Sequence, residues 1–69
     1  MLNMQVVVNG RPEDVEEGST VAALLDRLNL APVRVAVEIN EELVPRRTFA
    51  ETVVQTGDRI EIVTFVGGG

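Results

Sequence analysis

A single amphipathic segment limits what this 69-residue chain can fold into. Four apolar residues recur at the i, i+3, i+4, i+7 spacing of one helical face: Val21, Leu24, Leu25 and Leu28. Thr20 supplies an N-cap oxygen in front of them, and Asn29 and Pro32 end the segment. The pattern predicts a helix over Thr20–Leu28. Because no other element of so short a chain can fill the centre, its apolar face must be core and not a groove for a partner.

The first residues predict a β-hairpin. Met4–Val8 is short and rich in β-branched residues, and Asn9-Gly10 follows it as a strong turn signal because both residues tolerate positive φ. Pro12 cannot donate to a strand ladder, so we expect the second strand to begin after it, at Glu13–Glu17. Val15 is the only apolar residue there, which is typical of an acidic edge strand that resists aggregation.

Short strands and turns also fill the region after the helix. Val33–Ile39 alternates apolar and polar residues with the period of two that predicts a strand with one buried face. The segments after it are expected to be, in order, a turn at Asn40–Glu42, a very short strand at Leu43–Val44, an exit at Pro45–Arg47, an irregular helical turn under the sheet at Thr48–Val54, and a turn at Thr56–Asp58.

The last predicted strand, Arg59–Val66, is apolar on both faces in its second half. Ile60 and Ile62 lie on one side, and Val63 and Phe65 on the other. Apolar residues on both faces favour a strand in the middle of the sheet. With one helix to cover one face, Val63 and Phe65 either form an exposed docking patch or are covered by the loop from Arg46 to Val54, and the sequence leaves both open.

The predicted order ββαβββ indicates an α+β fold of the ubiquitin-like β-grasp kind. We expect a mixed sheet of four to five strands with one main helix packed on one face. A chain of this length has room for one core, so residues 1–66 are predicted to form a single domain. The sequence does not decide which strand separates the first from the third.

Composition excludes most forms of catalysis. The chain has no Cys and no His, so thiolate nucleophiles, imidazole bases, disulfides and the usual zinc ligands are missing. A carboxylate pair can hydrolyse a glycosidic bond, but it needs a cleft that so small a domain can scarcely form. We therefore expect no catalytic residue, no metal site and no cofactor bound by this chain. A carrier or a substrate of other enzymes fits better.

Net charge and hydropathy limit the classes of partner that the chain can bind. Eleven acidic residues against six arginines give a net charge of −5, which disfavours binding to a phosphate backbone. No apolar run approaches the roughly 20 residues that cross a bilayer. We expect a soluble, cytoplasmic protein that binds neither nucleic acid nor membrane.

The chain ends in Gly67-Gly68-Gly69, directly after the last strand. Glycine has no Cβ, so a tail over residues 67–69 can pass through a channel too narrow for ordinary side chains. Three extended residues reach roughly 10 Å, which would present the Gly69 carboxylate to another protein's active site. The alternative is a frayed terminus without a function.

Several motifs, in order, resemble one family. They are Val8-Asn9-Gly10, Val37-Glu38-Ile39-Asn40, Val44-Pro45-Arg46, Gly57-Asp58-Arg59-Ile60-Glu61-Ile62-Val63 and Val66-Gly67-Gly68-Gly69. Together they look like the ThiS family, the sulfur carriers of thiamine biosynthesis. Members commonly begin close to the first strand, so Met4 is a candidate native start and Met1 the start of an extension.

The resemblance implies roles for the glycines at the end of the chain and for three residues of the folded body. Gly69 would be adenylated and then converted to a thiocarboxylate, while Gly67 and Gly68 thread into partner sites. Val63, Phe65 and Arg46 would contact partner surfaces.

The implied partners are an adenylyltransferase similar to ubiquitin-activating enzymes, which uses ATP and Mg²⁺, a persulfide sulfur donor and a thiazole synthase. Two alternatives stay open at this point. One is a sulfur carrier for another pathway, such as molybdopterin synthesis, and the other is a passive β-grasp interaction module.

Overall fold

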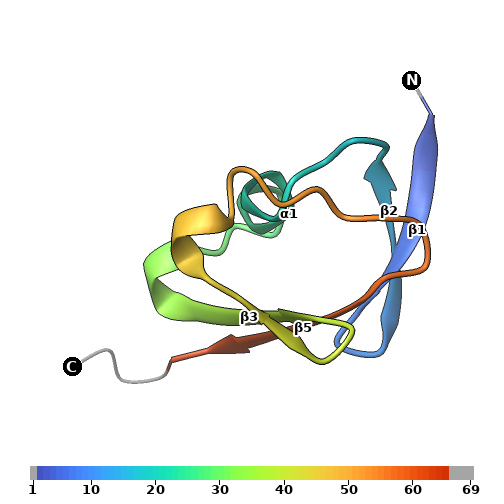
Figure 1. Cartoon of the computed structure of the whole chain (residues 1–69). Coiled ribbons are helices and arrows are strands. Elements are labelled where there is room, and N and C mark those ends of the chain that lie inside the picture. The colour runs from blue at the N-terminus through green and yellow to red at the C-terminus, as the bar shows by residue number, and fades with distance from the viewer. Residues whose placement is uncertain (1, 66–69) are drawn as a thin grey trace.

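The computed structural model describes residues 2–65 of the chain, and within them the predicted order ββαβββ is confirmed. The strands are β1 (Asn3–Val8), β2 (Arg11–Glu16), β3 (Val35–Ile39), β4 (Glu42–Val44) and β5 (Arg59–Thr64), and the helix is α1 (Val21–Arg27). Two short 3-10 turns complete the chain, η1 (Pro32–Arg34) and η2 (Arg46–Thr48). Figure 1 shows α1 lying across one face of the twisted sheet.

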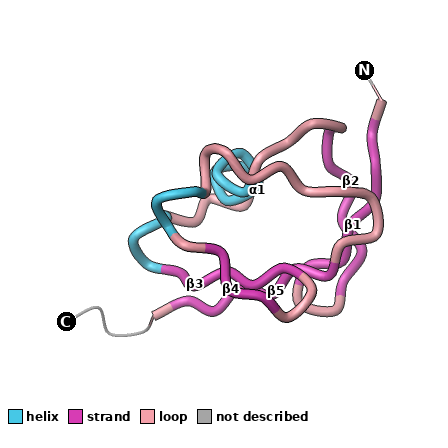
Figure 2. The backbone as a smooth tube through the Cα atoms, viewed as in Figure 1, coloured by secondary structure: helices cyan, strands magenta, loops and turns pink. Residues whose placement is uncertain are grey.

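The sheet has five strands in the order β2-β1-β5-β3-β4. β5 runs parallel to β1 and antiparallel to β3, so the sheet is mixed as predicted. The prediction of a central last strand is confirmed, and β5 is the strand that separates the first from the third. Figure 2 shows that the first and last strands of the chain lie side by side in this sheet.

Two hairpins turn on asparagine. Asn9 and Gly10 have φ values of +50° and +83°, and Asn40 and Glu41 have +51° and +73°. Two consecutive positive φ angles are typical of the type I′ turn, whose twist matches that of the flanking strands. The second turn therefore occupies two residues, and the predicted turn at Asn40–Glu42 is one residue too long because Glu42 already pairs with Ile39 in the ladder.

The predicted start of the second strand after Pro12 is wrong. β2 begins at Arg11, and Pro12 pairs with Val7 inside the strand. Proline is tolerated because β2 lies at the edge of the sheet, where a residue facing away from β1 has no ladder partner to donate to. Val15 is the one buried residue of β2, so the prediction of an acidic edge strand is confirmed.

The start of the third strand was also predicted too early. β3 begins at Val35, because Pro32 opens the tight turn η1. In this turn the Arg34 N–H donates to the Ala31 carbonyl at 2.9 Å. Val33 consequently points to solvent with 64% of its surface exposed and does not join the buried face.

The helix matches its prediction closely. Thr20 is the N-cap, and its side-chain oxygen accepts a hydrogen bond from the Ala23 N–H at 3.1 Å. Val21, Leu24 and Leu25 are buried and Leu28 is half-buried, which confirms that the apolar face is core. This face packs in a cluster with the side chains that the sheet turns toward α1, among them Val6, Val37 and Ile60.

The segment from Arg46 to Val54 packs on the helix side of the molecule. Its backbone accepts hydrogen bonds from the first turn of α1, since the Val21 N–H donates to the Thr52 carbonyl and the Ala22 N–H to the Phe49 carbonyl, each at 2.9 Å. Phe49 and Val54 are buried, as expected for a turn under the sheet, whereas Val53 is 43% exposed. The helical turn itself begins at Arg46, earlier than predicted.

Leu25→Ala is expected to destabilise the domain by about 2 to 5 kcal/mol, because it empties a fully buried site. In a domain of this size such a loss approaches the whole free energy of unfolding. Urea denaturation followed by circular dichroism measures it. Val33→Ala, at an exposed position, is the control and should change the free energy of unfolding by less than about 0.5 kcal/mol. Equal losses in both variants would contradict the described core.

Candidate functional site

The candidate site begins where β5 ends. Gly67, Gly68 and Gly69, which the sequence singled out, lie outside the described residues together with Val66. What the structure places is the stem in front of them, from Ile60 to Phe65. Figure 1 shows this stem leaving the sheet at the end of the molecule opposite the N-terminus.

The stem is held on both sides. Toward β3, the Phe65 N–H donates to the Arg34 carbonyl at 2.8 Å, one residue beyond the end of β5. Toward β1, the pairing is short and covers only Val7 with Arg59 and Val8 with Ile60. The backbone of the stem is therefore fixed as far as Phe65, although β1 has already ended.

Asn9 extends the β1 side with its side chain. Its amide nitrogen donates to the Ile62 carbonyl at 3.0 Å, and its amide oxygen accepts from the Ile62 N–H at 2.8 Å. These two bonds replace the backbone partner that a longer β1 would have given Ile62. Sequence reasoning assigned Asn9 only a turn role, because nothing local indicates a partner 53 residues away.

Val63 and Phe65 are exposed. They lie on the sheet face that points away from α1, with 60% and 50% of their surfaces accessible. The sequence left open whether the loop from Arg46 to Val54 covers them, and the structure shows that this loop packs on the opposite, helix side. Ala36, the strand partner of Val63, continues the apolar surface onto β3.

Arg46 lies at the same end of the sheet. Its Nε donates to the Pro32 carbonyl at 3.2 Å and so joins η2 to η1. η1 leads directly into the part of β3 that pairs with the end of β5. The structure thus places Arg46 at the end of the sheet where β5 ends, on the helix side, whereas Val63 and Phe65 lie on the opposite face.

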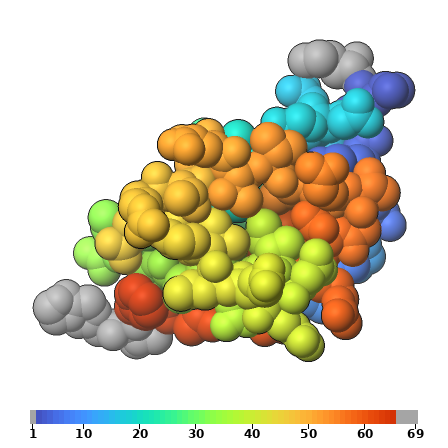
Figure 3. Space-filling view, viewed as in Figure 1, coloured from blue at the N-terminus to red at the C-terminus, as the bar shows by residue number. Residues whose placement is uncertain are grey.

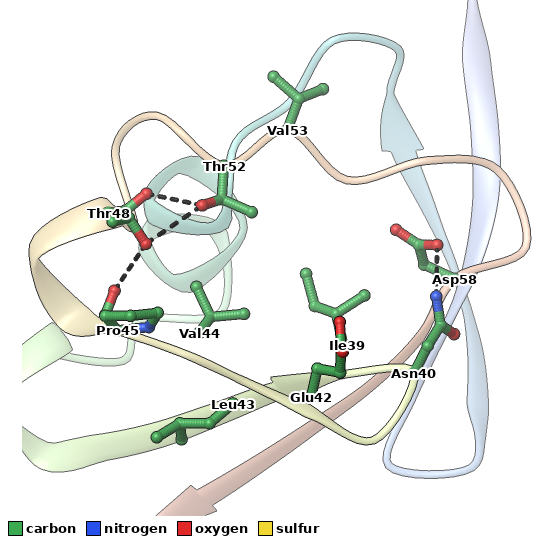
Figure 4. Close-up of a pocket in the computed structure, with 10 residues that line it drawn as sticks. All are labelled: Ile39, Asn40, Glu42, Leu43, Val44, Pro45, Thr48, Thr52, Val53 and Asp58. Atoms are coloured by element: carbon green, nitrogen blue, oxygen red, sulfur yellow. Dashed lines mark hydrogen bonds between the residues drawn. The ribbon is translucent and has the colours of Figure 1, made fainter.

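A groove of about 370 Å³ opens elsewhere, between β4 and the segment that precedes β5. Figure 4 shows that the polar side chains of Thr48, Thr52, Asn40 and Asp58 are bonded within the fold. The Thr48 hydroxyl donates to the Pro45 carbonyl and the Thr52 hydroxyl to the Thr48 carbonyl, each at 2.9 Å, and the Asn40 amide donates to Asp58 at 3.1 Å. Both hydroxyls that line the groove are therefore committed to backbone carbonyls, which disfavours a role as nucleophiles.

Among residues 2–65 no three His, Cys, Asp or Glu side chains lie close enough together to hold a metal ion. No helix in this part of the chain is both long and apolar enough to cross a membrane.

The chain matches the model of the ThiS family over residues 5–69. It belongs to the ThiS family. The sulfur carrier protein ThiS of Escherichia coli is 35% identical over 66 residues, which cover 96% of this chain and all of that protein. A crystal structure titled as the thiamine biosynthesis protein ThiS of Geobacter metallireducens superposes with a TM-score of 0.81 at 40% identity, covering 96% of this chain and all of that one. This solved ThiS structure supports the assignment of the ubiquitin-like β-grasp fold.

ThiS-like sequence also occurs within longer proteins. A thiazole synthase of Magnetococcus marinus is 46% identical over 66 residues, which cover 96% of this chain and 20% of that protein. The match to a thiazole synthase of Paramagnetospirillum magneticum covers the same share, so this chain spans about a fifth of the length of both.

Asn9→Gly is expected to loosen the stem. Glycine keeps the positive φ of the turn but removes both hydrogen bonds to Ile62. The cost is about 1 kcal/mol of folding free energy, and hydrogen exchange at the Ile62 amide should be faster. Exchange measured by NMR checks this.

Glu41→Gly is the matched control, since it changes the other type I′ turn at a positive φ and touches no bond to Ile62. Protection of Ile62 that survives Asn9→Gly would show that the side-chain bonds do not fix the stem.

Proposed function

We propose that this chain is a sulfur carrier whose Gly69 carboxylate is activated and converted to a thiocarboxylate for the thiazole ring of thiamine. The observation that carries the proposal is the family match, which runs from the first strand to residue 69. The described stem supports it, because a fixed central strand leads directly into the glycine run.

The length and composition of the tail suit such a reaction. The four residues after Phe65 extend for about 13 Å when fully stretched. Residues 67–69 have no side chains, so they fit a narrow channel while the folded body remains at its mouth. In this proposal residues up to 66 form the folded domain and residues 67–69 form the tail.

Activation is needed because a carboxylate is a poor electrophile. An adenylyltransferase similar to ubiquitin-activating enzymes would join the Gly69 carboxylate to the α-phosphate of ATP, with Mg²⁺ in the partner and pyrophosphate as the leaving group. The product is an acyl-adenylate, whose carbonyl carbon is open to attack because AMP departs readily.

Sulfur then enters from a persulfide. The terminal sulfur of a cysteine persulfide on another protein attacks the carbonyl, AMP leaves, and an acyl disulfide forms. A second thiol cleaves its sulfur–sulfur bond, which releases the Gly69 thiocarboxylate and leaves a disulfide behind. The carrier supplies only the reacting carboxylate, in line with the expectation that it is not itself an enzyme.

Thiazole synthase is the proposed acceptor of this sulfur. Two proteins named thiazole synthase contain a region similar to this chain, and a shared polypeptide is one way to keep a carrier close to its acceptor. The same similarity favours thiamine over molybdopterin as the pathway. Because the activation consumes ATP, we propose that the reaction takes place in the cytoplasm.

Intact-mass spectrometry tests the proposal. Purified chain is incubated with the adenylyltransferase, ATP, Mg²⁺ and a persulfide donor. The expected result is a mass increase equal to the difference between one sulfur and one oxygen, located at Gly69 by fragmentation. An unchanged mass, under conditions in which the Escherichia coli carrier is modified, would favour a passive interaction module.

Deletion of Gly69 is the control for that experiment. The shortened chain should gain no sulfur, since its carboxylate stops one residue short of the reacting position. Its melting temperature should stay the same, because glycine has no side chain to bury. A large drop in melting temperature would contradict a tail that stands apart from the folded body.

The double substitution Val63→Ala and Phe65→Ala is expected to weaken docking. Both side chains are exposed beside the stem, so their loss should raise the KM for the carrier in the adenylation reaction about tenfold while the melting temperature changes little. Leu2→Ala, at an exposed position near the opposite end, is the control. Equal KM values for the double variant and the natural chain would show that these two residues do not contribute to the interface with the adenylyltransferase.

A further inference from the structure

Charge is distributed unevenly around the stem. Three segments meet where β5 ends, namely 32–36, 43–48 and 63–65. These segments contain three arginines and no acidic residue, although the chain as a whole has eleven acids and a net charge of −5. The eleven acids lie outside these segments, and two of them, Glu38 and Glu61, pair with each other beside Val63 and so border this region on the sheet face that points away from α1.

Contacts join these segments at one end of the molecule, where the two faces of the sheet meet. β5 reaches Arg34 through the Phe65 N–H and Ala36 through the pairing of Val63. The hydrogen bond from Arg46 to the carbonyl of Pro32 ties η2 to η1. Figure 2 shows both 3-10 turns at the end of the molecule where β5 ends, and Figure 3 shows the yellow segment with β4 and η2 beside the red end of β5.

We call this region the arginine surface. Its members are all exposed: Arg34, Arg46 and Arg47, with the apolar side chains of Val33, Val63 and Phe65. A guanidinium group binds a carboxylate through two parallel hydrogen bonds, and neighbouring apolar contacts exclude water and so strengthen that pairing. The surface therefore has the composition of an interface for an acidic protein surface.

We propose that the arginine surface docks on a rim of carboxylates around the channel of the adenylyltransferase that receives the tail. This inference rests on the proposed function and names the chemistry of the partner that recognises the carrier. The arginines stand on the folded body where β5 ends, and four residues follow Phe65, which would span about 13 Å if fully stretched. The arginines meet the mouth of the channel, and the nucleotide lies at its inner end.

The positions of the arginines favour one orientation of the carrier as it approaches the adenylyltransferase. A net charge of −5 repels an acidic partner, but three positive charges at one end turn that end toward it. Such steering acts mainly on the association rate and weakens as salt shortens the range of the attraction. The end of the carrier with the tail would thus face the adenylyltransferase before the two proteins touch.

Two charge-reversal variants with equal net charge separate this proposal from a general effect of charge. The test variant carries Arg34→Glu and Arg47→Glu, and keeps Arg46 because its side chain holds the Pro32 carbonyl. The control carries Arg11→Glu and Arg59→Glu, two exposed positions outside the arginine surface. Circular dichroism confirms that both fold, and Arg34→Gln with Arg47→Gln provides a milder test variant.

Association with the adenylyltransferase of the same organism is measured by stopped flow at low and at high salt, first without nucleotide and then with ATP. At low salt the test variant should associate about tenfold more slowly than the natural chain, and the control within about twofold. High salt should slow the natural chain and reduce the difference. The Gln variant should lie between the natural chain and the test variant.

Three results would overturn the inference. They are equal slowing by the test and control variants, faster association of the natural chain at high salt, and a charge effect that arises only when ATP is bound, which would assign the arginines to phosphates. If the natural chain is thiolated normally and any of these is seen, the proposed function stands and the inference fails. If the natural chain neither binds the adenylyltransferase nor gains sulfur, both the proposed function and this inference are wrong.

Discussion

The pairing of β5 with both β1 and β3 is the interaction on which the rest of the structure depends. Without β5 the sheet would separate into two hairpins, β1–β2 and β3–β4, and an isolated hairpin is marginal in water. The last strand of the chain is thus also the centre of its sheet. Any segment that continues from β5 starts from a strand that is bonded on both sides as far as Ile62 and on the β3 side as far as Phe65. A carrier needs such a fixed base for its tail.

The side chains of β5 alternate between a buried face, which stabilises the fold, and an exposed face, which is available to a partner. Ile60 and Ile62 face α1 and belong to the core, while Val63 and Phe65 face away from it and stay exposed. Successive side chains of a strand point to opposite faces, so one short segment can serve both purposes. The β-grasp arrangement allows this because its one helix covers only one face of the sheet, and the loop from Arg46 to Val54 lies on that same side.

Local patterns were sufficient wherever a residue's role depends on its near neighbours. The helix, its Thr20 cap and the Asn9-Gly10 turn were predicted because helical spacing, capping and positive φ involve residues a few positions apart. The errors lie at element boundaries. Pro12 is accepted within β2 only because that strand is an edge, and Pro32 opens a 3-10 turn that delays β3 to Val35.

The sequence by itself determined the element order, the apolar helical face, the apolar last strand and the glycine run of a ThiS-family chain. Only the tertiary structure decided that β5 lies between β1 and β3, that Asn9 bonds to Ile62, that the Phe65 N–H bonds to the Arg34 carbonyl, and that the Arg46 side chain bonds to the Pro32 carbonyl. The physical reason is that these contacts join residues far apart in the chain. The period of the apolar residues predicts which face of an element a side chain lies on. Which distant residue it contacts is decided only when the strands have assembled into the sheet.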